Sequence, residues 1–223
     1  MSSEFFFFLF FLIVASSASA ADNRIETKPG CQPKCGNVNI PYPFGIGANC
    51  SIGDWAKVTC NTTFNPPKPF VLNNVEVLQI SLTELRFQQK IIAIKFYNQS
   101  GAFIGGHGVE YVFSDSPYTF SSTKNKITAI GGCYSSCTKK DEVILEPCSG
   151  SGCCEMHVPK GLNQLSIDIN SISNPNHSEI WPFAPYSVAV IGEEGRHKFT
   201  ISDFSDTTSL QDIPVVLNFG VGN

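Results

Sequence analysis

The chain has 223 residues, with 15 basic and 19 acidic side chains and a formal net charge of −4. This acidic balance gives no support to nucleic-acid binding. The length suffices for one or two domains with real cores, and nine cysteines make the redox compartment the next question.

The N-terminus has the pattern of a secretory signal. Phe5 to Ala15 is an apolar run of eleven residues, which suits a signal core and is too short to span a bilayer. Ala18-Ser19-Ala20 has the small residues of a cleavage site. Residues 1–20 are therefore predicted to be a signal peptide, although the first residues carry Glu4 and no Lys or Arg. Because no later run reaches the ~18 apolar residues of a membrane helix, we expect a secreted chain without a membrane span.

Residues 28–70 are predicted to be a cysteine-rich module. Four cysteines alternate with prolines, glycines and aromatic residues that exclude a helix or a long strand: Cys31, Cys35, Cys50 and Cys60. Secretion favours disulfides. Zinc is the main rival, but the Cys-x3-Cys spacings lack the partner spacing of a zinc site, and we expect no metal and no cofactor. The four cysteines should pair among themselves, in one of three connectivities.

Residues 71–220 are predicted to be β-rich, with short strands separated by Gly, Ser, Asn and Pro. The expected strands are 75–82, 91–97, 111–113, 126–130, 143–145, 165–169, 186–191, 198–201 and 215–219. The fold class is therefore all-β, with a β-sandwich or barrel-like region of short strands after the module. Residues 206–211 could form one or two helical turns.

A second cysteine cluster lies in this β-rich part: Cys133, Cys137, Cys148, Cys153 and Cys154. Because the total of nine is odd, one thiol here should be unpaired or should cross-link two copies in a disulfide-linked dimer. Four Asn-x-Ser/Thr sequons predict N-glycosylation at Asn49, Asn61, Asn98 and Asn176.

Patterns of catalysis are missing from the sequence. There is no Gly-x-Ser-x-Gly elbow, no His-Glu-x-x-His and no phosphate-binding loop. Gly105-Gly106-His107-Gly108 is interpreted as a hairpin turn, and the four isolated histidines as surface residues. We therefore do not expect an enzyme.

The first module has the chemistry to bind an acidic polysaccharide. Aromatic faces stack on sugar rings, and lysines pair with carboxylates. Residues 21–70 hold five basic against three acidic side chains. The candidate binding residues are Lys34, Tyr42, Phe44, Trp55, Lys57 and Lys68. The alternative is that the three aromatic residues form the small core of the module, and the residues alone favour this alternative.

The motif Cys31-x3-Cys35-Gly36, the run from Ile40 to Ile46 (Ile-Pro-Tyr-Pro-Phe-Gly-Ile) and Cys50 resemble the galacturonan-binding module of plant wall-associated receptor kinases. The resemblance covers about residues 28–220. It implies an extracellular protein that binds pectin (homogalacturonan), an acidic polysaccharide of the plant cell wall. Full-length members are membrane receptors with a cytoplasmic Ser/Thr kinase, which this chain lacks. We therefore expect a secreted or truncated ectodomain, or alternatively an ectodomain fragment that recognises a peptide or protein ligand.

Three positions depart from the family pattern, in which cysteines are expected near Phe96, Gly132 and Pro185. The cysteine missing near Pro185 would bond one member of the second cluster. The resemblance therefore points to Cys153 or Cys154 as the unpaired thiol.

Overall fold

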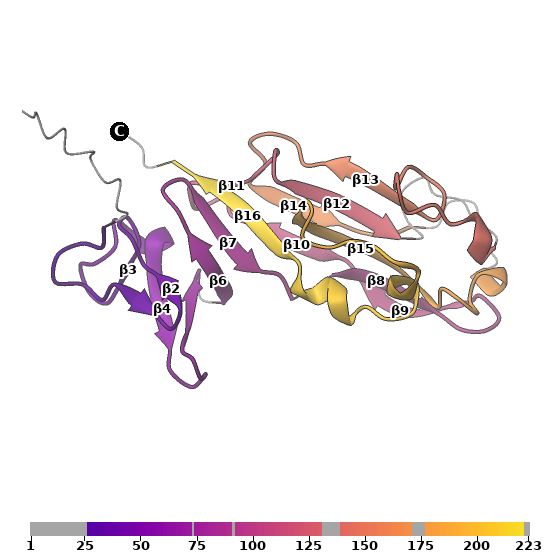
Figure 1. Ribbon diagram of the computed structural model, residues 1–223, viewed down its shortest axis with the longest axis horizontal. Helices are drawn as coiled ribbons and strands as arrows, with labels where there is room; N and C mark the ends of the chain where they lie inside the picture. The colour runs from indigo at the N-terminus through magenta and orange to yellow at the C-terminus, as the bar shows by residue number, and fades with distance from the viewer. Residues whose placement is uncertain (1–25, 73, 91, 131–138, 171–176, 221–223) are drawn as a thin grey trace, which may run out of the picture.

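The computed structural model describes residues 26–72, 74–90, 92–130, 139–170 and 177–220. These residues form an elongated, all-β molecule with four sheets and five short 3-10 helices, and they contain no α-helix (Figure 1). The predicted signal peptide, residues 1–20, lies outside the described residues.

The largest sheet has seven strands in the order β11-β16-β7-β6-β5-β4-β3. The strands are β3 (Gly45–Ile46), β4 (Lys57–Asn61), β5 (Lys68–Val71), β6 (Val75–Ile80), β7 (Glu84–Gln88), β11 (Tyr118–Phe120) and β16 (Pro214–Phe219). Only β3 and β4 pair in parallel, and the pairing of β6 with β7 shifts register between Val77 and Gln79. The strands of the cysteine-rich module therefore continue into one sheet with later parts of the chain.

The second sheet has five antiparallel strands in the order β13-β12-β15-β8-β9. They are β8 (Ala93–Tyr97), β9 (Phe103–His107), β12 (Asn125–Ile130), β13 (Cys153–His157) and β15 (Tyr186–Glu193). Buried Asn125 links this sheet to the first, because its Nδ2 donates to the carbonyl of Val216 at 2.7 Å and its Oδ1 accepts from the amide of Val216 at 2.9 Å. This side chain satisfies both backbone groups of a buried residue.

Two small antiparallel sheets complete the strands. They are β1 (Lys34–Cys35) with β2 (Val38–Asn39), and β10 (Val109–Val112) with β14 (Gln164–Ile167). The 3-10 helices are η1 (Asp54–Ala56), η2 (Lys140–Glu142), η3 (His177–Glu179), η4 (Ile201–Phe204) and η5 (Thr208–Asp212).

The interior is continuous from the first module into the later strands. One buried cluster contains Cys35 and Phe44 of the module together with Phe120 and Phe219. A second cluster, around Ile94, Val188 and Phe204, lies beneath the five-stranded sheet. Burial of these apolar side chains, at roughly 25 cal/mol per Å², is the main driving force for joining the sheets.

The predicted fold class, all-β with a disulfide-rich module first, is confirmed. The sheets of the described residues are open, and none closes into a barrel. The strands expected at 75–82, 126–130, 186–191 and 215–219 are present as β6, β12, β15 and β16.

Three local predictions are wrong. Residues 143–145 and 198–201 are not strands. Val143, Leu145, Phe199 and Ile201 pack against the second cluster without a partner strand, and Ile201 begins η4. Gly105, Gly106 and His107 belong to β9 and not to a turn. A Cβ on Gly106 would lie 2.2 Å from the carbonyl oxygen of Ile94, so glycine here permits close approach of β8 and β9.

Candidate functional site

Two disulfides hold the first module. Cys31 bonds Cys50 and Cys35 bonds Cys60, with Cα–Cα distances of 5.7 and 5.6 Å. The prediction that these four cysteines pair among themselves is confirmed. Gly36, which follows Cys35, has φ +55°, and a Cβ there would lie 2.1 Å from the carbonyl oxygen of Pro67. The start of the module therefore packs directly against the segment that leads into β5.

Phe44 and Trp55 are part of the interior. Phe44 is fully buried, and its ring meets Trp55 edge to face at a centroid distance of 5.7 Å. Trp55 is half-buried and also contacts Tyr118 at 5.7 Å and Phe219 at 6.0 Å. The prediction that Phe44 binds a ligand is wrong, because a side chain without exposed surface cannot stack on a sugar. The contacts of Trp55 fit the alternative that the sequence favoured, in which this residue belongs to the core of the module.

Lys57 and Lys68 lie on one face of the β4–β5 ladder. Lys57 and Asn61 point to the same side because side chains alternate along a strand, and Asn61 pairs directly with Lys68. The four residue steps from Lys57 to Asn61 separate the two lysines by about 13 Å along the strands. This face can therefore contact two charges that are spaced along an extended ligand.

Aromatic side chains accompany Lys68. Its Nζ lies 5.1 Å from the ring centroid of Phe64, and Phe64 is 6.1 Å from Phe70. Phe64 is 40% exposed. Sequence reasoning missed both phenylalanines, although their position next to the Pro66-Pro67-Lys68 segment was a usable signal.

The remaining candidates are exposed. Tyr42 keeps 45% of its surface accessible, and Lys34 lies exposed on the short strand β1. Among the described residues, neither Lys34 nor Lys57 forms an ion pair, whereas Lys68 Nζ lies 2.7 Å from Glu76 Oε1. Lys34 and Lys57 are thus the two candidate lysines whose charges are open to a ligand.

Glu76 is buried between two lysines. Lys90 Nζ approaches its Oε2 at 2.8 Å, while Lys68 Nζ lies 2.7 Å from its Oε1. Burial alone would raise the pKa of Glu76, but the hydrogen bonds and charges of Lys68 and Lys90 outweigh it and hold the pKa below its ordinary value. Glu76 therefore stays ionised and holds both lysines in place.

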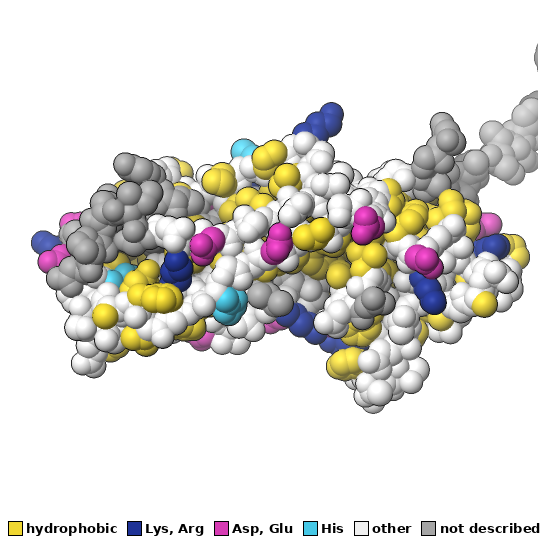
Figure 2. All heavy atoms as spheres, turned by 180° about the vertical axis from the view of Figure 1, so that it is seen from behind, with side chains coloured by type: hydrophobic (Ala, Val, Ile, Leu, Met, Phe, Trp, Pro, Cys, Tyr) yellow, Lys and Arg dark blue, Asp and Glu magenta, His cyan; other side chains and the backbone are white. Residues whose placement is uncertain are grey.

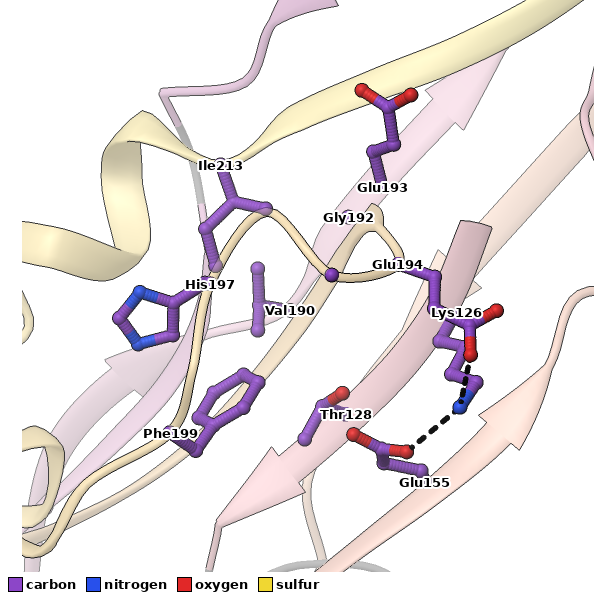
Figure 3. A pocket seen from close by; sticks show the side chains of 11 residues that line it. Lys126, Thr128, Glu155, Val190, Gly192, Glu193, Glu194, His197, Phe199 and Ile213 are labelled. Atoms are coloured by element: carbon purple, nitrogen blue, oxygen red, sulfur yellow. Dashed lines mark hydrogen bonds and ion pairs between the residues drawn. The ribbon is translucent and has the colours of Figure 1, made fainter. Parts of the chain in front are cut away.

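A small hollow lies over the face of β12, β13 and β15, where residues 194–199 pass across it (Figure 3). Its volume is about 40 Å³, which admits water molecules and not a sugar ring. Lys126 lies on its wall, 2.8 Å from Glu194 and 3.2 Å from Glu155, and hydrogen bonds to these two carboxylates raise its pKa. With its cation already paired, this hollow is not a binding site for a carboxylated sugar.

The histidines divide between surface and interior. His107 and His157 are exposed, as expected. The prediction is wrong for His177, which is buried, stacks on Tyr97 at 3.8 Å and has its Nε2 2.7 Å from the carbonyl oxygen of Ala184. His197 Nε2 lies 3.1 Å from Asp203.

Asp203 also organises the turn around η4. Its carboxylate accepts hydrogen bonds from the Ser209 hydroxyl at 2.7 Å and from the Thr200 amide at 2.7 Å. The Ser209 hydroxyl therefore bonds the carboxylate and not His197, so this group caps a helix and does not form a catalytic relay. The described residues contain no group of three or more His, Cys, Asp or Glu side chains arranged to hold a metal ion.

The second cysteine cluster is partly described. Cys148 bonds Cys153, and Cys154 is also in a disulfide. The assignment of the unpaired thiol to Cys153 or Cys154 is therefore wrong. Cys133 and Cys137 lie outside the described residues, and an unpaired thiol remains a prediction for them.

Three of the four sequons are described. Asn49 and Asn98 are exposed, while Asn61 is half-buried. The side-chain oxygen of Asn61 accepts from the amide and the hydroxyl of Thr63 at 2.9 and 2.7 Å. Asn176 lies outside the described residues. Glycosylation stays a prediction.

Comparison with known proteins finds a matching family model and relatives from the same family. The family "Wall-associated receptor kinase galacturonan-binding" matches residues 31–91. The chain is 28% identical over 219 residues to wall-associated receptor kinase 1 of Arabidopsis thaliana, a match that covers 86% of this chain and 28% of that protein. Wall-associated receptor kinase-like 4 of the same plant is 30% identical over 179 residues, covering 67% of this chain and 23% of the relative. No solved structure matches the chain significantly.

The chain thus spans less than a third of the length of these relatives, and the match does not reach their kinase portion. In the described part of the chain, no helix is both long enough and apolar enough to cross a bilayer. Residues 31–91 form a wall-associated receptor kinase galacturonan-binding domain, and most of the chain is distantly homologous to the ectodomains of these kinases.

Proposed function

We propose that this protein binds pectin outside the cell, by contacting demethylated homogalacturonan through the exposed face of its first module. The observation that carries the proposal is the family match over residues 31–91, which contains two lysines, Lys34 and Lys57, without an ion partner among the described residues. An ammonium group that is not already paired can bind a uronate carboxylate without first losing another partner.

The proposed contact surface consists of Lys34, Tyr42, Lys57 and Lys68, with Phe64 added from the geometry and with Phe44 and Trp55 removed. Lys68 contributes less than the other lysines because Glu76 already neutralises it. Figure 2 shows acidic, basic and hydrophobic side chains interspersed over the face opposite to that of Figure 1, without a block of positive charge. Binding should therefore be weak for each sugar and strengthened by the number of repeats in the polymer.

The test is retention of the secreted protein on immobilised polygalacturonate and on its methyl ester. The proposal predicts retention on the acid form, release by added salt, and weaker retention on the ester, because exposed charge pairs are screened by salt and vanish on esterification. Equal retention on both polymers, or none on either, would contradict it.

A second function, recognition of a peptide or protein, is favoured by the edge of the five-stranded sheet. β9 is the terminal strand there, and it exposes Phe103 by 58% and Ile104 by 62%. An edge strand with exposed apolar side chains is a surface on which an extended segment can add as a further strand. Binding of a peptide that Phe103→Ser or Ile104→Ser abolishes, with no retention on polygalacturonate, would support this alternative.

A further inference from the structure

A cleft of about 350 Å³ opens between the family-matched region and the strand β10. Neither Lys34 nor Lys57 lines it. Its volume is within the range of small-molecule sites, roughly 300–1,000 Å³. The residues that give it chemical character are Glu76, Phe87, Gln89, Lys90, Glu110 and Tyr111.

Gln89 lines this cleft with an unused hydrogen-bond donor. Its side chain is buried, with 1% exposed, and its Oε1 accepts a hydrogen bond from the hydroxyl of Tyr111 at 3.0 Å. Its Nε2 has no hydrogen-bond partner in the part of the chain that the structure describes. A buried amide without an acceptor is unfavourable, and a ligand oxygen in the cleft would relieve this.

The charges around the cleft cancel. Glu76 carries one negative charge between Lys68 and Lys90, at 2.7 and 2.8 Å. Glu110, whose Oε1 accepts from Gln164 at 3.0 Å, adds a second negative charge. The two ammonium groups are already held by Glu76, and the net charge of these four side chains is zero. A carboxylated ligand therefore gains little here, whereas hydroxyl groups can both donate to the carboxylates and accept from Gln89.

The inner wall is aromatic. Phe87 meets Tyr111 and Phe113 edge to face, each at a centroid distance of 6.2 Å. All three residues line the cleft. An apolar wall with a few polar groups suits a ring that has one C–H face and a rim of hydroxyl groups.

We propose that this cleft binds one uncharged pyranose residue, and that it is a second saccharide site distinct from the lysine-bearing face. The neutral sugar would place a hydroxyl oxygen on Gln89 Nε2 and its C–H face on Tyr111, the half-buried ring of this wall. This site is independent of polygalacturonate binding, because it uses none of the lysines that are open to a uronate.

The test titrates the full secreted chain with methyl β-D-galactopyranoside, methyl β-D-glucopyranoside and the sodium salt of methyl α-D-galactopyranosiduronate. The readout is the NMR signal of the Gln89 side-chain amide, which reports occupancy without any mutation. At least one neutral glycoside should shift this signal at a lower concentration than the uronate does.

Variants then locate the contact. Gln89→Leu removes the donor and should lower the affinity for the neutral glycoside by about three- to tenfold, as expected for one lost hydrogen bond. Tyr111→Phe keeps the ring but removes the hydroxyl that holds Gln89 Oε1, so it should also weaken binding of the neutral glycoside, and it serves as a second probe if Gln89→Leu does not fold. Gln99→Leu, at an exposed glutamine outside the cleft, should have no effect.

Three results would overturn the proposal. These are an unchanged Gln89 signal with both neutral glycosides, equal affinity in wild type, Gln89→Leu and Tyr111→Phe, or a stronger response to the uronate than to the neutral sugars. None of them depends on whether the protein binds polygalacturonate, so failure of this site and failure of the proposed function can be told apart.

Discussion

The ammonium group of Lys68 lies 2.7 Å from a carboxylate oxygen of Glu76, a side chain that is 7% exposed and that also binds Lys90. This arrangement joins the strands β5 and β6 at the place where the outer face of the module meets the cleft. Lys68 therefore has a structural partner, while Lys34 and Lys57 have none among the described residues. The difference separates a lysine that stabilises the fold from lysines that can bind a ligand.

The first prediction concerns Glu76→Gln. Removing this charge should lower the free energy of unfolding by about 1 kcal/mol, a modest loss because Lys68 and Lys90 are 40% and 59% exposed. The same change should raise polygalacturonate affinity about twofold, because Lys68 loses its competitor. Urea unfolding and a retention assay measure the two effects. Glu179→Gln, an exposed glutamate outside the module, is the control with the same change in charge.

The pH dependence of the same variant has a defined sign. Because the pKa of Glu76 is lowered in the fold, its contribution to stability is present above its ordinary pKa of 4.5 and is lost as pH falls through the lower folded value. Glu76→Gln should therefore lose less stability than wild type as pH falls below about 4.5. An equal loss of stability in both proteins would show that Lys68 and Lys90 do not lower the pKa of Glu76 in the fold.

The second prediction concerns the disulfide Cys35–Cys60, which spans 25 residues of sequence. Replacing both cysteines with serine should destabilise the protein by about 3–4 kcal/mol, because the unfolded chain regains the entropy of the open loop. Chemical denaturation of the double variant measures this loss. The bond Cys31–Cys50 spans 19 residues and should give a slightly smaller effect. Peptide mapping without reduction should find no link from these four cysteines to residues 133–154.

The third prediction concerns Tyr118, which ties β11 to the first module. Its buried hydroxyl donates to the carbonyl of Trp55 at 2.9 Å, and burial raises its pKa so that the proton stays on the oxygen. Tyr118→Phe should cost about 1–2 kcal/mol, because the Trp55 carbonyl loses its donor. Thermal unfolding should remain a single transition. Two transitions would indicate that the module and the later strands unfold separately.

The fourth prediction concerns buried His177. Burial lowers its pKa, although its hydrogen bond to the carbonyl of Ala184 acts in the opposite direction. The unfolded chain therefore binds a proton more readily than the folded one, and this site should destabilise the fold as pH falls below about 6.5.

His177→Gln tests this directly. The variant should be less stable than wild type at pH 8 because stacking on Tyr97 is lost, yet it should lose less further stability between pH 8 and pH 5. His107→Gln, at an exposed histidine, is the matched control. If the free energy of unfolding changed with pH by the same amount in wild type and His177→Gln, the lowered pKa of His177 would be contradicted.

Short runs of strand-forming residues between turn residues predicted the central strands of the five-stranded sheet. β12 and β15 are central strands of their sheet, and their pairing follows the predicted runs closely. Residues 198–201 form a similar run, but Phe199 packs into the second cluster and Ile201 begins η4. Local periodicity reports which side chains are buried, and it does not report whether a neighbouring strand is available.

The role of an aromatic residue was the least predictable feature. Tyr42, Phe44 and Trp55 are equivalent in a sequence, and only the fold shows that Phe44 meets Phe219 from the far end of the chain. The same limit applies to Gln89, whose buried amide is defined by strand β10, about 20 residues later in the sequence. Contacts between distant segments decide which side chains remain for a ligand.

The most direct test of the account compares wild type with the double variant Lys34→Gln/Lys57→Gln in binding to demethylated polygalacturonate, at low and at raised ionic strength. Both lysines are exposed and unpaired among the described residues, so the variant should fold normally. We predict that it binds about fivefold more weakly at low salt, and that added salt reduces the difference. Equal affinity of the two proteins at low salt would contradict the account.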